Sequence, residues 1–578
     1  MSTGLETHTT RNNRCLRHVV PLIDRVRIPH RSITSTTDGT QIRNVCGASL
    51  GFGYIVPHLI IKRRDAVRTP RHETFSLSFG SVVGPPHLFP QALGNRSLSF
   101  PFSTFPKRIY HCCRFYGSSI HSTSPTLYTN LKVGFITPLM GDDYTFQTLE
   151  ALIADAGLIP PSKLPPPAKK KVLLVATHAH QTTGYSKVVY HVLQELAKHP
   201  QFALFHFGFQ KFLEAPPGYR EYPAGVQVYD PVAKEKDGTA EKEMGFGFSQ
   251  LPAYLRQVKP DIVLIYNDAG VICRFLDSLE KSIPAHERNY KLLIYLDQVF
   301  TIQRPELLAR IDKDAHQYIA FTNYWKEVLA VQGIRKPIHV LRHGFDPVQF
   351  KPMDRTAMRK KHGLPDQVFL FLNLNRNTPR KRHDIVVMAF AELVARHPAK
   401  PLALMAVCDA GEQGGYPIQE IFVRELERLK VNPQYHIQKL LITKTALTYT
   451  DEMINELYAM SDVGITAAEG EGFGLCQFEA MGIGIPQVVP KIGGFRDFVK
   501  DGVNSIAVPT KWRSYMALSQ SSVGGIAELV DPHDLMLAAE RYVMDTDLRE
   551  RHGAEARKTV LAYTWEKEVA SLVRVLDS

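Results

Sequence analysis

The carboxylates of Glu471 and Glu479 are eight positions apart, and the first lies inside a glycine-rich stretch that reads GEGFG at 470–474. The residues before this stretch, 461–466, are typical of a short buried strand, and a helix is predicted to begin near Leu475. Junctions of this kind line the ligand crevice at the carboxyl ends of parallel strands. Glycines let a ligand approach the backbone there, and the first N–H groups of the helix favour an anion. A single Glu would fit an acidic surface loop, but the whole string in this order favours a ligand site.

This stretch resembles the motif of the retaining, nucleotide-sugar-dependent glycosyltransferases of the GT-B fold, called glycosyltransferase family 4 or group 1. In that motif an EGFG string opens a pair of glutamates separated by seven residues, and a GG turn follows; here Glu471 and Glu479 match the pair and 492–494 match the turn. The resemblance implies that Glu479 holds the ribose hydroxyls of the nucleotide and that Glu471 faces the donor sugar. The implied donor-binding set is completed by Gly472, Phe473, Gly474 and Leu475.

Two cations, Arg376 and Lys381, lie five positions apart in the loop between an apolar strand at 367–375 and a helix predicted for 385–396. Arg offers phosphate oxygens a planar fork and Lys offers a compact charge, here beside a helix N-terminus. By the resemblance, this pair clamps the donor diphosphate and stabilises its charge during catalysis. The neighbouring Arg380 and Arg382 are interpreted as part of a solvated basic loop.

A first strand at 171–176 leads into a loop at 177–186, and the next helix has an apolar face. In the related family this loop faces the donor diphosphate and the acceptor, and Gly184 matches it, although a single Gly replaces the usual pair. His178 and His180 in the same loop lack a third ligand, so loop histidines are a better interpretation than a metal site.

Strands and helices alternate through residues 170–350 and again through 355–560, which indicates parallel sheets. The predicted fold class is therefore α/β, and by the resemblance it is GT-B, with two Rossmann-like doubly wound domains facing each other across a cleft. The first is the acceptor domain and the second the donor domain. A C-terminal helix within 561–578 is expected to cross back onto the first domain, and 510–525 is predicted to be a loop.

Many members of the related class carry a His after the fifth strand of the first domain, where this chain has Leu296 followed by Asp297. Asp268 and Asp297 both stand at predicted strand ends that face the crevice. Two interpretations apply equally to each aspartate: it orients a sugar hydroxyl or the acceptor, or it is the N-cap residue of a helix. Asp297 is included among the predicted catalytic residues with Arg376, Lys381 and Glu471.

Other enzyme classes fit the sequence less well. The dinucleotide-binding fingerprint requires glycines at i, i+2 and i+5, but Leu475 and Gln477 occupy the third position for the two available starts, and no Walker A sequence is present. The Asp-x-Asp strings at 312–314 and 545–547 fall in predicted helical segments and are interpreted as surface acids. No metal and no cofactor are expected beyond the nucleotide sugar itself.

The net charge of +12 is concentrated in residues 1–130, which hold 16 Lys and Arg against 5 Asp and Glu. The rest of the chain is almost neutral, so no nucleic-acid partner is expected. Residues 1–130 are interpreted as a basic extension of low order, either a long organellar transit peptide, a disordered tail, a nucleic-acid or membrane tether, or sequence translated from a misplaced start. A helix at 145–156 and a Pro-rich linker are predicted within 131–169.

The 7 cysteines are irregularly spaced, which favours a reducing compartment. The expected location is cytoplasmic, or organellar if the N-terminus is a transit peptide. No apolar run reaches the roughly 18 residues of a spanning helix, so any membrane contact is expected to be peripheral.

These features together predict a retaining glycosyltransferase that moves a sugar from a nucleoside-diphosphate sugar to the hydroxyl of a glycan, lipid or small-molecule acceptor. Two alternatives stay open: a non-catalytic nucleotide-sugar-binding scaffold of the same fold, which the missing His favours, and a sugar-nucleotide epimerase or hydrolase.

Overall fold

The structure is a computed structural model that describes residues 168–578, with the exception of 213, 215–217, 236–241, 413, 444–448 and 517–520. The predicted basic extension at 1–130 and nearly all of the predicted helix and linker at 131–169 lie outside the described residues. Those predictions therefore stay predictions.

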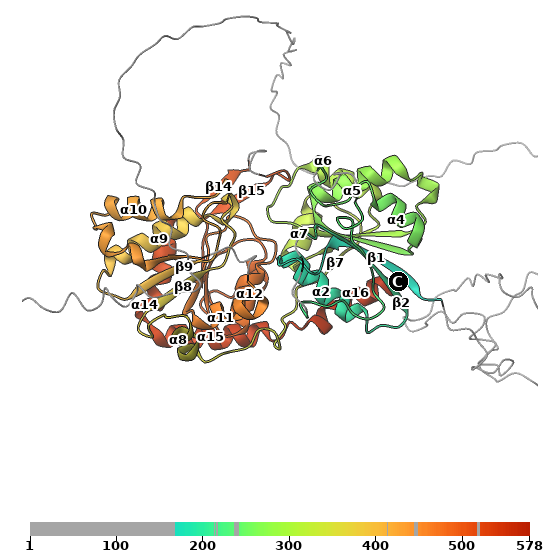
Figure 1. Cartoon of the computed structure of the whole chain (residues 1–578). Coiled ribbons are helices and arrows are strands. Elements are labelled where there is room, and N and C mark those ends of the chain that lie inside the picture. The colour runs from blue at the N-terminus through green and yellow to red at the C-terminus, as the bar shows by residue number, and fades with distance from the viewer. Residues whose placement is uncertain are drawn as a thin grey trace, which may run out of the picture. The chain divides into compact units, whose positions relative to one another are not determined.

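The N-terminal half, residues 168–350, is built on a seven-stranded parallel sheet with the order β3-β2-β1-β4-β5-β6-β7. Its strands are β1 (Lys170–Thr177), β2 (Phe202–Phe209), β3 (Gln227–Tyr229), β4 (Ile262–Asp268), β5 (Lys291–Asp297), β6 (Gln317–Ala320) and β7 (Ile338–Val340). Helices cover both faces of the sheet (Figure 1): α2 (Gly184–Leu196), α4 (Leu251–Val258), α5 (Ala269–Ser282), α6 (Pro305–Asp314) and α7 (Asn323–Val331).

The C-terminal half, residues 355–560, carries a six-stranded parallel sheet with the order β10-β9-β8-β11-β12-β13. Its strands are β8 (Phe369–Asn373), β9 (Leu402–Ala406), β10 (Leu440–Ile442), β11 (Val463–Ile465), β12 (Gln487–Pro490) and β13 (Ile506–Val508). The helices are α8 (Arg355–Lys361), α9 (His383–Arg396), α10 (Ile418–Arg428), α11 (Asp451–Met460), α12 (Leu475–Gly482), α13 (Phe495–Phe498), α14 (Pro532–Met544) and α15 (Thr546–Val560).

The central strands of both sheets are apolar on both faces because helices cover each side. In β1, for example, Leu173 and Val175 are completely buried, and so are Leu370 of β8 and Val463 of β11. Near-continuous apolar runs are what a parallel sheet between two helical layers requires. The strand orders are those of doubly wound sheets, as the sequence predicted.

The prediction of a loop at 510–525 is wrong. Residues Trp512–Tyr515 form β14, which pairs antiparallel with β15 (Ile526–Leu529). All four residues of β14 are exposed, so the strand shows no apolar alternation in the sequence. Backbone contacts hold the hairpin instead: the Ile526 N–H donates to the Thr301 carbonyl (2.9 Å) and the Glu528 N–H to the Glu469 carbonyl (3.0 Å).

The C-terminal helix α16 (Trp565–Asp577) lies against α2 of the N-terminal half, so the prediction that it crosses back is confirmed (Figure 1). Polar contacts fix its middle and its C-terminal end. The Ser571 hydroxyl donates to the carbonyl of Val340 (3.3 Å), and the Lys170 ammonium donates to the carbonyl of Leu576 (2.7 Å). The apolar face of α16, which includes Leu572 and Leu576, is buried.

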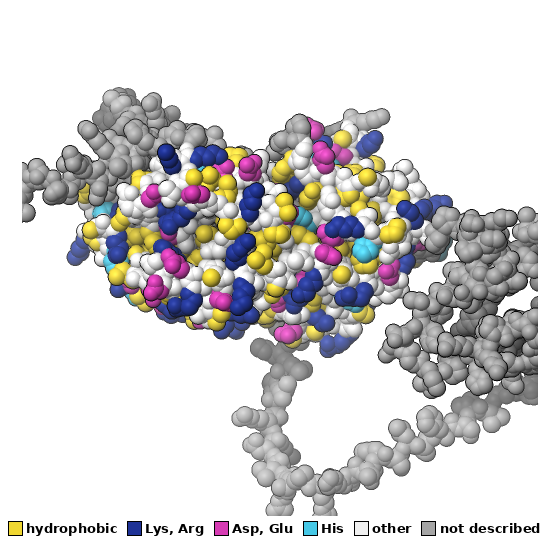
Figure 2. All heavy atoms as spheres, turned by 90° about the horizontal axis from the view of Figure 1, so that it is seen from below, with side chains coloured by type: hydrophobic (Ala, Val, Ile, Leu, Met, Phe, Trp, Pro, Cys, Tyr) yellow, Lys and Arg dark blue, Asp and Glu magenta, His cyan; other side chains and the backbone are white. Residues whose placement is uncertain are grey.

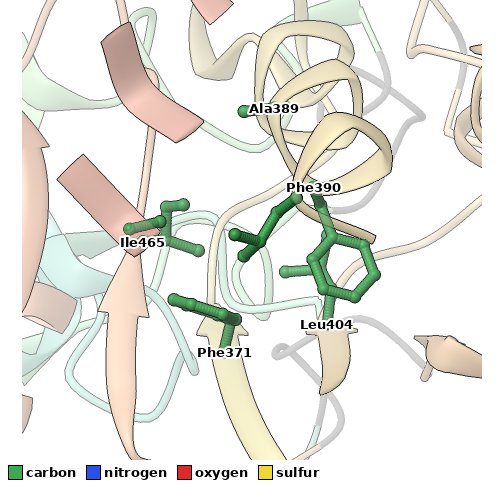
Figure 3. A pocket seen from close by; sticks show the side chains of 7 residues that line it. Phe371, Ala389, Phe390, Leu404 and Ile465 are labelled. Carbon is green, nitrogen blue, oxygen red and sulfur yellow. The ribbon is translucent and has the colours of Figure 1, made fainter. Parts of the chain in front are cut away.

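A cavity of about 10 Å³ lies inside the core of the C-terminal half (Figure 3). Its lining is entirely apolar and includes Phe371 of β8, Phe390 of α9 and Ile465 of β11. A space this small and dry is at or below the limit for one water molecule. It is a packing gap between the sheet and its helices, and it does not serve as a ligand site.

One face of the molecule mixes charges of both signs. Figure 2 shows Lys and Arg interspersed with Asp and Glu on the face seen from below. None of the helices in the described part of the chain combines the length and the apolar character needed to cross a membrane.

Candidate active site

The glycine-rich turn at 470–474 follows β11 and leads directly into α12, which begins at Leu475 as predicted. Gly474 is the N-cap residue and has a φ of 93°, a left-handed conformation that side chains disfavour. The turn therefore reverses the chain within a few residues. It places Glu471 before the helix and Glu479 in its second turn.

The glycine pair at 493–494 packs backbone against backbone on this turn. The N–H of Gly494 donates to the carbonyl of Glu471 (2.9 Å), and a Cβ at 494 would overlap the carbonyl of Gly472. From the N-terminal half, the buried indole of Trp325 donates to the carbonyl of Gly472 (2.7 Å). Two separate segments thus contact the turn in its observed position, and the glycines at both places permit this close approach.

Glu471 and Lys381 form a partly buried ion pair, with side chains 12% and 13% exposed and 2.5 Å between the ammonium and the carboxylate Oε2. Arg380 contacts the same Oε2 at 3.4 Å and also donates to the carbonyl of Gly470 (2.5 Å). Burial alone would raise the pKa of Glu471, but Lys381 and Arg380 together outweigh burial and lower the pKa. Burial lowers the pKa of Lys381, against the opposing effect of Glu471. The site therefore holds an ionised carboxylate beside concentrated positive charge.

The structure does not bring Arg376 to this ion pair. Its side chain is 62% exposed and pairs with Glu412 at the surface. The interpretation of Arg380 and Arg382 as solvated residues is wrong for both. Arg380 contacts Glu471, and Arg382 pairs with Glu469 (3.2 Å) and Asp384 (2.7 Å). The reason is a short 3-10 turn at Pro379–Lys381, which points Arg380 and Lys381 toward the glycine-rich turn.

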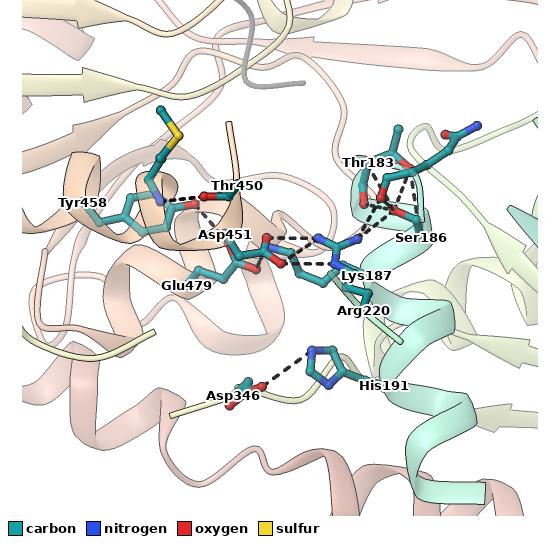
Figure 4. Close-up of polar contacts among 12 residues, drawn as sticks. Thr183, Ser186, Lys187, His191, Arg220, Asp346, Thr450, Asp451, Tyr458 and Glu479 are labelled. Atoms are coloured by element: carbon teal, nitrogen blue, oxygen red, sulfur yellow. Dashed lines mark hydrogen bonds and ion pairs between the residues drawn. The ribbon is translucent and has the colours of Figure 1, made fainter. Parts of the chain in front are cut away.

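Glu479 is buried in α12 and both of its carboxylate oxygens are occupied (Figure 4). The Lys187 ammonium of α2 donates to Oε1 (2.6 Å), and the Tyr458 hydroxyl of α11 donates to Oε2 (3.1 Å). Burial raises the pKa of Glu479, against the opposing charge of Lys187. A ribose that takes Glu479 as its ligand must therefore replace one of these partners.

Lys187 belongs to a four-charge cluster, made of Arg220, Asp451, Lys187 and Glu479, that joins the two halves (Figure 4). Lys187 also pairs with Asp451 (3.1 Å), and Arg220 pairs with the same carboxylate at 2.9 Å. Burial would lower the pKa of Lys187, but Glu479 and Asp451 outweigh it and raise the pKa. The sequence alone does not indicate this cluster, because its members lie far apart along the chain. Its one local signal is Lys187 itself, three residues after the Gly184 that the motif singled out.

Gly184 opens α2 at the carboxyl end of β1, with Thr183 as its N-cap. The side chain of Thr183 accepts from the N–H of Ser186 and the side chain of Ser186 accepts from the N–H of Thr183, a capping box. A Cβ at Gly184 would lie 3.7 Å from Leu475, so the start of α2 faces the start of α12. Gly184 is thereby placed beside the start of α12, and its predicted role in donor binding stays a prediction.

Asp268 and Asp297, for which the sequence predicts the same two roles, have different roles in the structure. Asp268 caps α5, because its Oδ1 accepts from the N–H of Val271 (3.0 Å). Asp297 caps no helix, since the next helix, α6, begins only at Pro305. Its Oδ2 accepts a hydrogen bond from the hydroxyl of Tyr185. Leu296, at the position of the family His, is buried in the sheet.

Residues 168–578, leaving aside the undescribed positions, hold no group of three or more His, Cys, Asp or Glu side chains arranged for a metal ion. Burial lowers the pKa of His178 to about 2, with further lowering from His206, so this imidazole stays neutral. Its Nδ1 accepts from the N–H of His180 (3.2 Å). The larger surface cavity, near Asp261 and Tyr290, lies before β4 and β5, at the opposite end of these strands from Asp297.

Residues 354–522 match the sequence profile of the family described as glycosyl transferases group 1. That range contains Lys381, the glycine-rich turn, Glu479 and the glycine pair at 493–494. Over this stretch the chain is similar to the group 1 glycosyltransferases. The resemblance drawn from the motif is confirmed at the level of the family.

Curated relatives of this chain include the D-inositol 3-phosphate glycosyltransferase of Geodermatophilus obscurus. It is 31% identical over 234 residues, which cover 40% of this chain and 46% of the relative. The D-inositol 3-phosphate glycosyltransferase 2 of Catenulispora acidiphila is 26% identical over 165 residues, covering 28% of this chain and 37% of the relative. The aligned part spans about half or less of the length of these relatives.

Solved structures similar to both halves include Anabaena HepE in complex with UDP and glucose, with a TM-score of 0.52 and 15% identity over 71% of this chain and 99% of that chain. The sucrose-phosphate synthase of Thermosynechococcus elongatus has a TM-score of 0.53 and 16% identity over 71% of this chain and 98% of that chain. At such identities the likeness shows the fold. The two facing sheets, with α16 crossing back, are the GT-B fold that the sequence predicted.

Proposed function

We propose that this protein is a retaining glycosyltransferase that transfers a sugar from a nucleoside-diphosphate sugar to a hydroxyl acceptor. The observation that carries the proposal is the partly buried ion pair of Lys381 and Glu471 beside the glycine-rich turn, inside the segment that matches the group 1 glycosyltransferases. A second observation supports the proposal: Glu479 is buried in α12, the helix that directly follows the glycine-rich turn.

In the proposed reaction the glycosidic bond to the diphosphate breaks and negative charge grows on the leaving group. Positive groups fixed in a dry site stabilise such charge without reorganising at the moment of reaction. Lys381 and Arg380 supply that charge, and Glu471 keeps both in place until the donor enters. Arg376 joins them by exchanging Glu412 for a phosphate oxygen. The departing phosphate takes up the proton of the acceptor hydroxyl on the same face, so the reaction needs neither a dedicated base nor a metal.

The donor is proposed to place its ribose hydroxyls on Glu479. UDP-glucose is the first donor to test, because HepE, which shares the fold, is in complex with UDP and glucose in one solved structure and with UDP-glucose in another. D-inositol 3-phosphate is the first acceptor to test, because the names of the relatives include it. A glycan or a lipid hydroxyl remains within the proposed acceptor class.

The test is a screen of common nucleotide sugars for release of nucleoside diphosphate, with and without D-inositol 3-phosphate, on wild type and Lys381→Ala. We expect release from one donor by wild type, and a rate lower by about 10²–10³ for Lys381→Ala. Lys430→Ala, a surface lysine in the same half, is the control and should keep the rate. The scaffold alternative, which Leu296 favours, predicts donor binding without release. Release that needs no acceptor at all would indicate a hydrolase.

A further inference from the structure

The carboxylate of Asp297 has one buried oxygen atom that makes no hydrogen bond within the described part of the chain. Its Oδ2 accepts from the Tyr185 hydroxyl, whereas its Oδ1 is buried and has no hydrogen-bond partner in the described part of the chain. A buried polar atom without a partner is costly, and such atoms in native structures call for an explanation. The explanation offered by the position of Asp297 is a ligand.

The position of Oδ1 is defined by both halves. Asp297 ends β5, and in register with it on β4 stands Asp268, whose carboxylate is used to cap α5. Across from Asp297 lies Gly472 of the glycine-rich turn, so close that a Cβ at 472 would overlap Oδ1. The free oxygen therefore faces the turn that is proposed to hold the donor sugar, on the side of the acceptor half.

Tyr185 is built into the first turn of α2, directly after Gly184. Its ring lies against that of Tyr266 (5.1 Å between centroids), which fixes its direction. Burial, with Asp297 next, raises the pKa of Tyr185 well above its ordinary value, so its hydroxyl remains a hydrogen-bond donor. Oδ2 is thereby held and Oδ1 is directed to the turn.

The ionisable groups that face Asp297 come from every element around it: Tyr185 of α2, Tyr266 of β4, Asp268 at the start of α5, Tyr295 of β5, Arg380 of the 3-10 turn and Glu471 of the glycine-rich turn. Burial raises the pKa of Asp297 to about 6, with Glu471 and Asp268 adding to the rise and Tyr185 and Arg380 opposing it. At neutral pH the carboxylate is ionised and can accept a hydrogen bond from a neutral hydroxyl.

We propose that Asp297 Oδ1 binds a carbohydrate hydroxyl at the junction of the two halves, and that Tyr185 is the positioning residue that aims it. This rests on the proposed function, and it assigns a hydroxyl-binding subsite to a position where the family His is replaced by Leu296. The hydroxyl belongs either to the acceptor or to the donor sugar. Binding requires the turn to withdraw from Asp297, since Gly472 contacts it in this structure.

The experiment compares wild type with Tyr185→Phe and Asp297→Asn in the full chain, with Tyr266→Phe as the matched control for loss of a buried hydroxyl. Affinities for UDP and UDP-glucose are measured by calorimetry, and turnover of the donor is measured from pH 5 to 8. If the hydroxyl is the acceptor's, both affinities stay unchanged while kcat/KM for the acceptor falls by about tenfold to a hundredfold in Asp297→Asn. If it is the donor sugar's, UDP-glucose binds more weakly by a similar factor and UDP does not.

The pH profile separates positioning from a structural role. Because the Tyr185 hydrogen bond favours the ionised form, Tyr185→Phe should move the acidic limb of kcat/KM to higher pH by about 1, and Asp297→Asn should remove that limb. An unmoved limb in Tyr185→Phe, or an equal movement in Tyr266→Phe, overturns the assignment of Tyr185. Unchanged affinities and kcat/KM in Asp297→Asn overturn the subsite. Failure of wild type to turn over any of the common nucleotide sugars would instead overturn the proposed function.

Discussion

Lys187 is the central member of the four-charge cluster, and its replacement by Met is expected to destabilise the protein more than loss of Glu479. Met keeps the aliphatic stem that lies over the ring of Phe350 (4.4 Å from the ammonium to the ring centroid) and removes only the charge. Asp451 would retain Arg220 as its partner, but Glu479 would be left with the hydroxyl of Tyr458 alone.

The expected loss of stability depends on which charged group is left without a partner. The side chain of Glu479 is 5% exposed, and breaking a buried pair so that one charge lacks a partner costs about 3–5 kcal/mol. In Glu479→Gln, Lys187 keeps Asp451 at 3.1 Å, so the expected loss is that of a hydrogen bond with a buried partner, about 1–3 kcal/mol. Lys198→Met, at an exposed pair with Glu195, should lose at most about 1 kcal/mol.

The loss of stability in Lys187→Met is expected to depend on pH. Burial already raises the pKa of Glu479, and removing Lys187 raises it further. The folded state then binds a proton more tightly than the unfolded state, so stability falls as pH rises through the folded pKa and is recovered below it. The deficit of Lys187→Met should therefore be largest near pH 8 and shrink toward pH 5.

The assay is calorimetric unfolding of wild type, Lys187→Met, Glu479→Gln and Lys198→Met at pH 8, 6.5 and 5, compared by the midpoint temperatures. The expected order of stability at pH 8 is wild type, Lys198→Met, Glu479→Gln and Lys187→Met. Equal midpoints for Lys187→Met and Lys198→Met, or a deficit of Lys187→Met that does not shrink at low pH, would refute the reasoning about the cluster.

Three further results are expected. Glu479→Gln should weaken UDP binding about tenfold to a hundredfold, because a charge-assisted hydrogen bond to the ribose is lost. The measurement is calorimetric titration of the folded variant with UDP, and an affinity equal to that of wild type would contradict the prediction. Arg376→Ala and Lys381→Ala should each lower the rate of turnover by about 10²–10³, a larger effect than on donor binding, as measured by steady-state kinetics. A chelator should leave the wild-type rate unchanged, and a rate that falls with chelator would show that the reaction depends on a metal. A protein that begins at Ala168 should fold and bind UDP like the full chain, and insolubility or a much lower unfolding temperature would show that earlier residues belong to the core.

Local chemistry made much of the site predictable from the sequence. The glycine-rich turn and the start of α12 at Leu475 follow from glycine spacing and the apolar pattern, both of which act over a few residues. The strands of both sheets were recognisable because strands buried on both faces are almost wholly apolar. Those signals are independent of distant partners.

Long-range pairing was not predictable from the sequence. The partner of Glu479 is Lys187, 292 positions away, and nothing in either segment indicates that the fold brings them together. Arg380 was misjudged because the direction of a side chain in a 3-10 turn depends on how that turn packs against the loop at 469–471. The exposed strand β14 was missed because exposure on both faces leaves no periodic pattern.

The central claim is sugar transfer with retention by the partly buried Lys381–Glu471 site, and its most direct test is the anomeric configuration of the first product. The donor found in the screen, with UDP-glucose as the starting candidate, is incubated with wild type and the acceptor, and the anomeric configuration of the new glycosidic bond is read by proton NMR. The account predicts that the configuration of the donor is kept and that Lys381→Ala forms product about 10²–10³ times more slowly. An inverted product, or donor binding without any product from wild type, would contradict it.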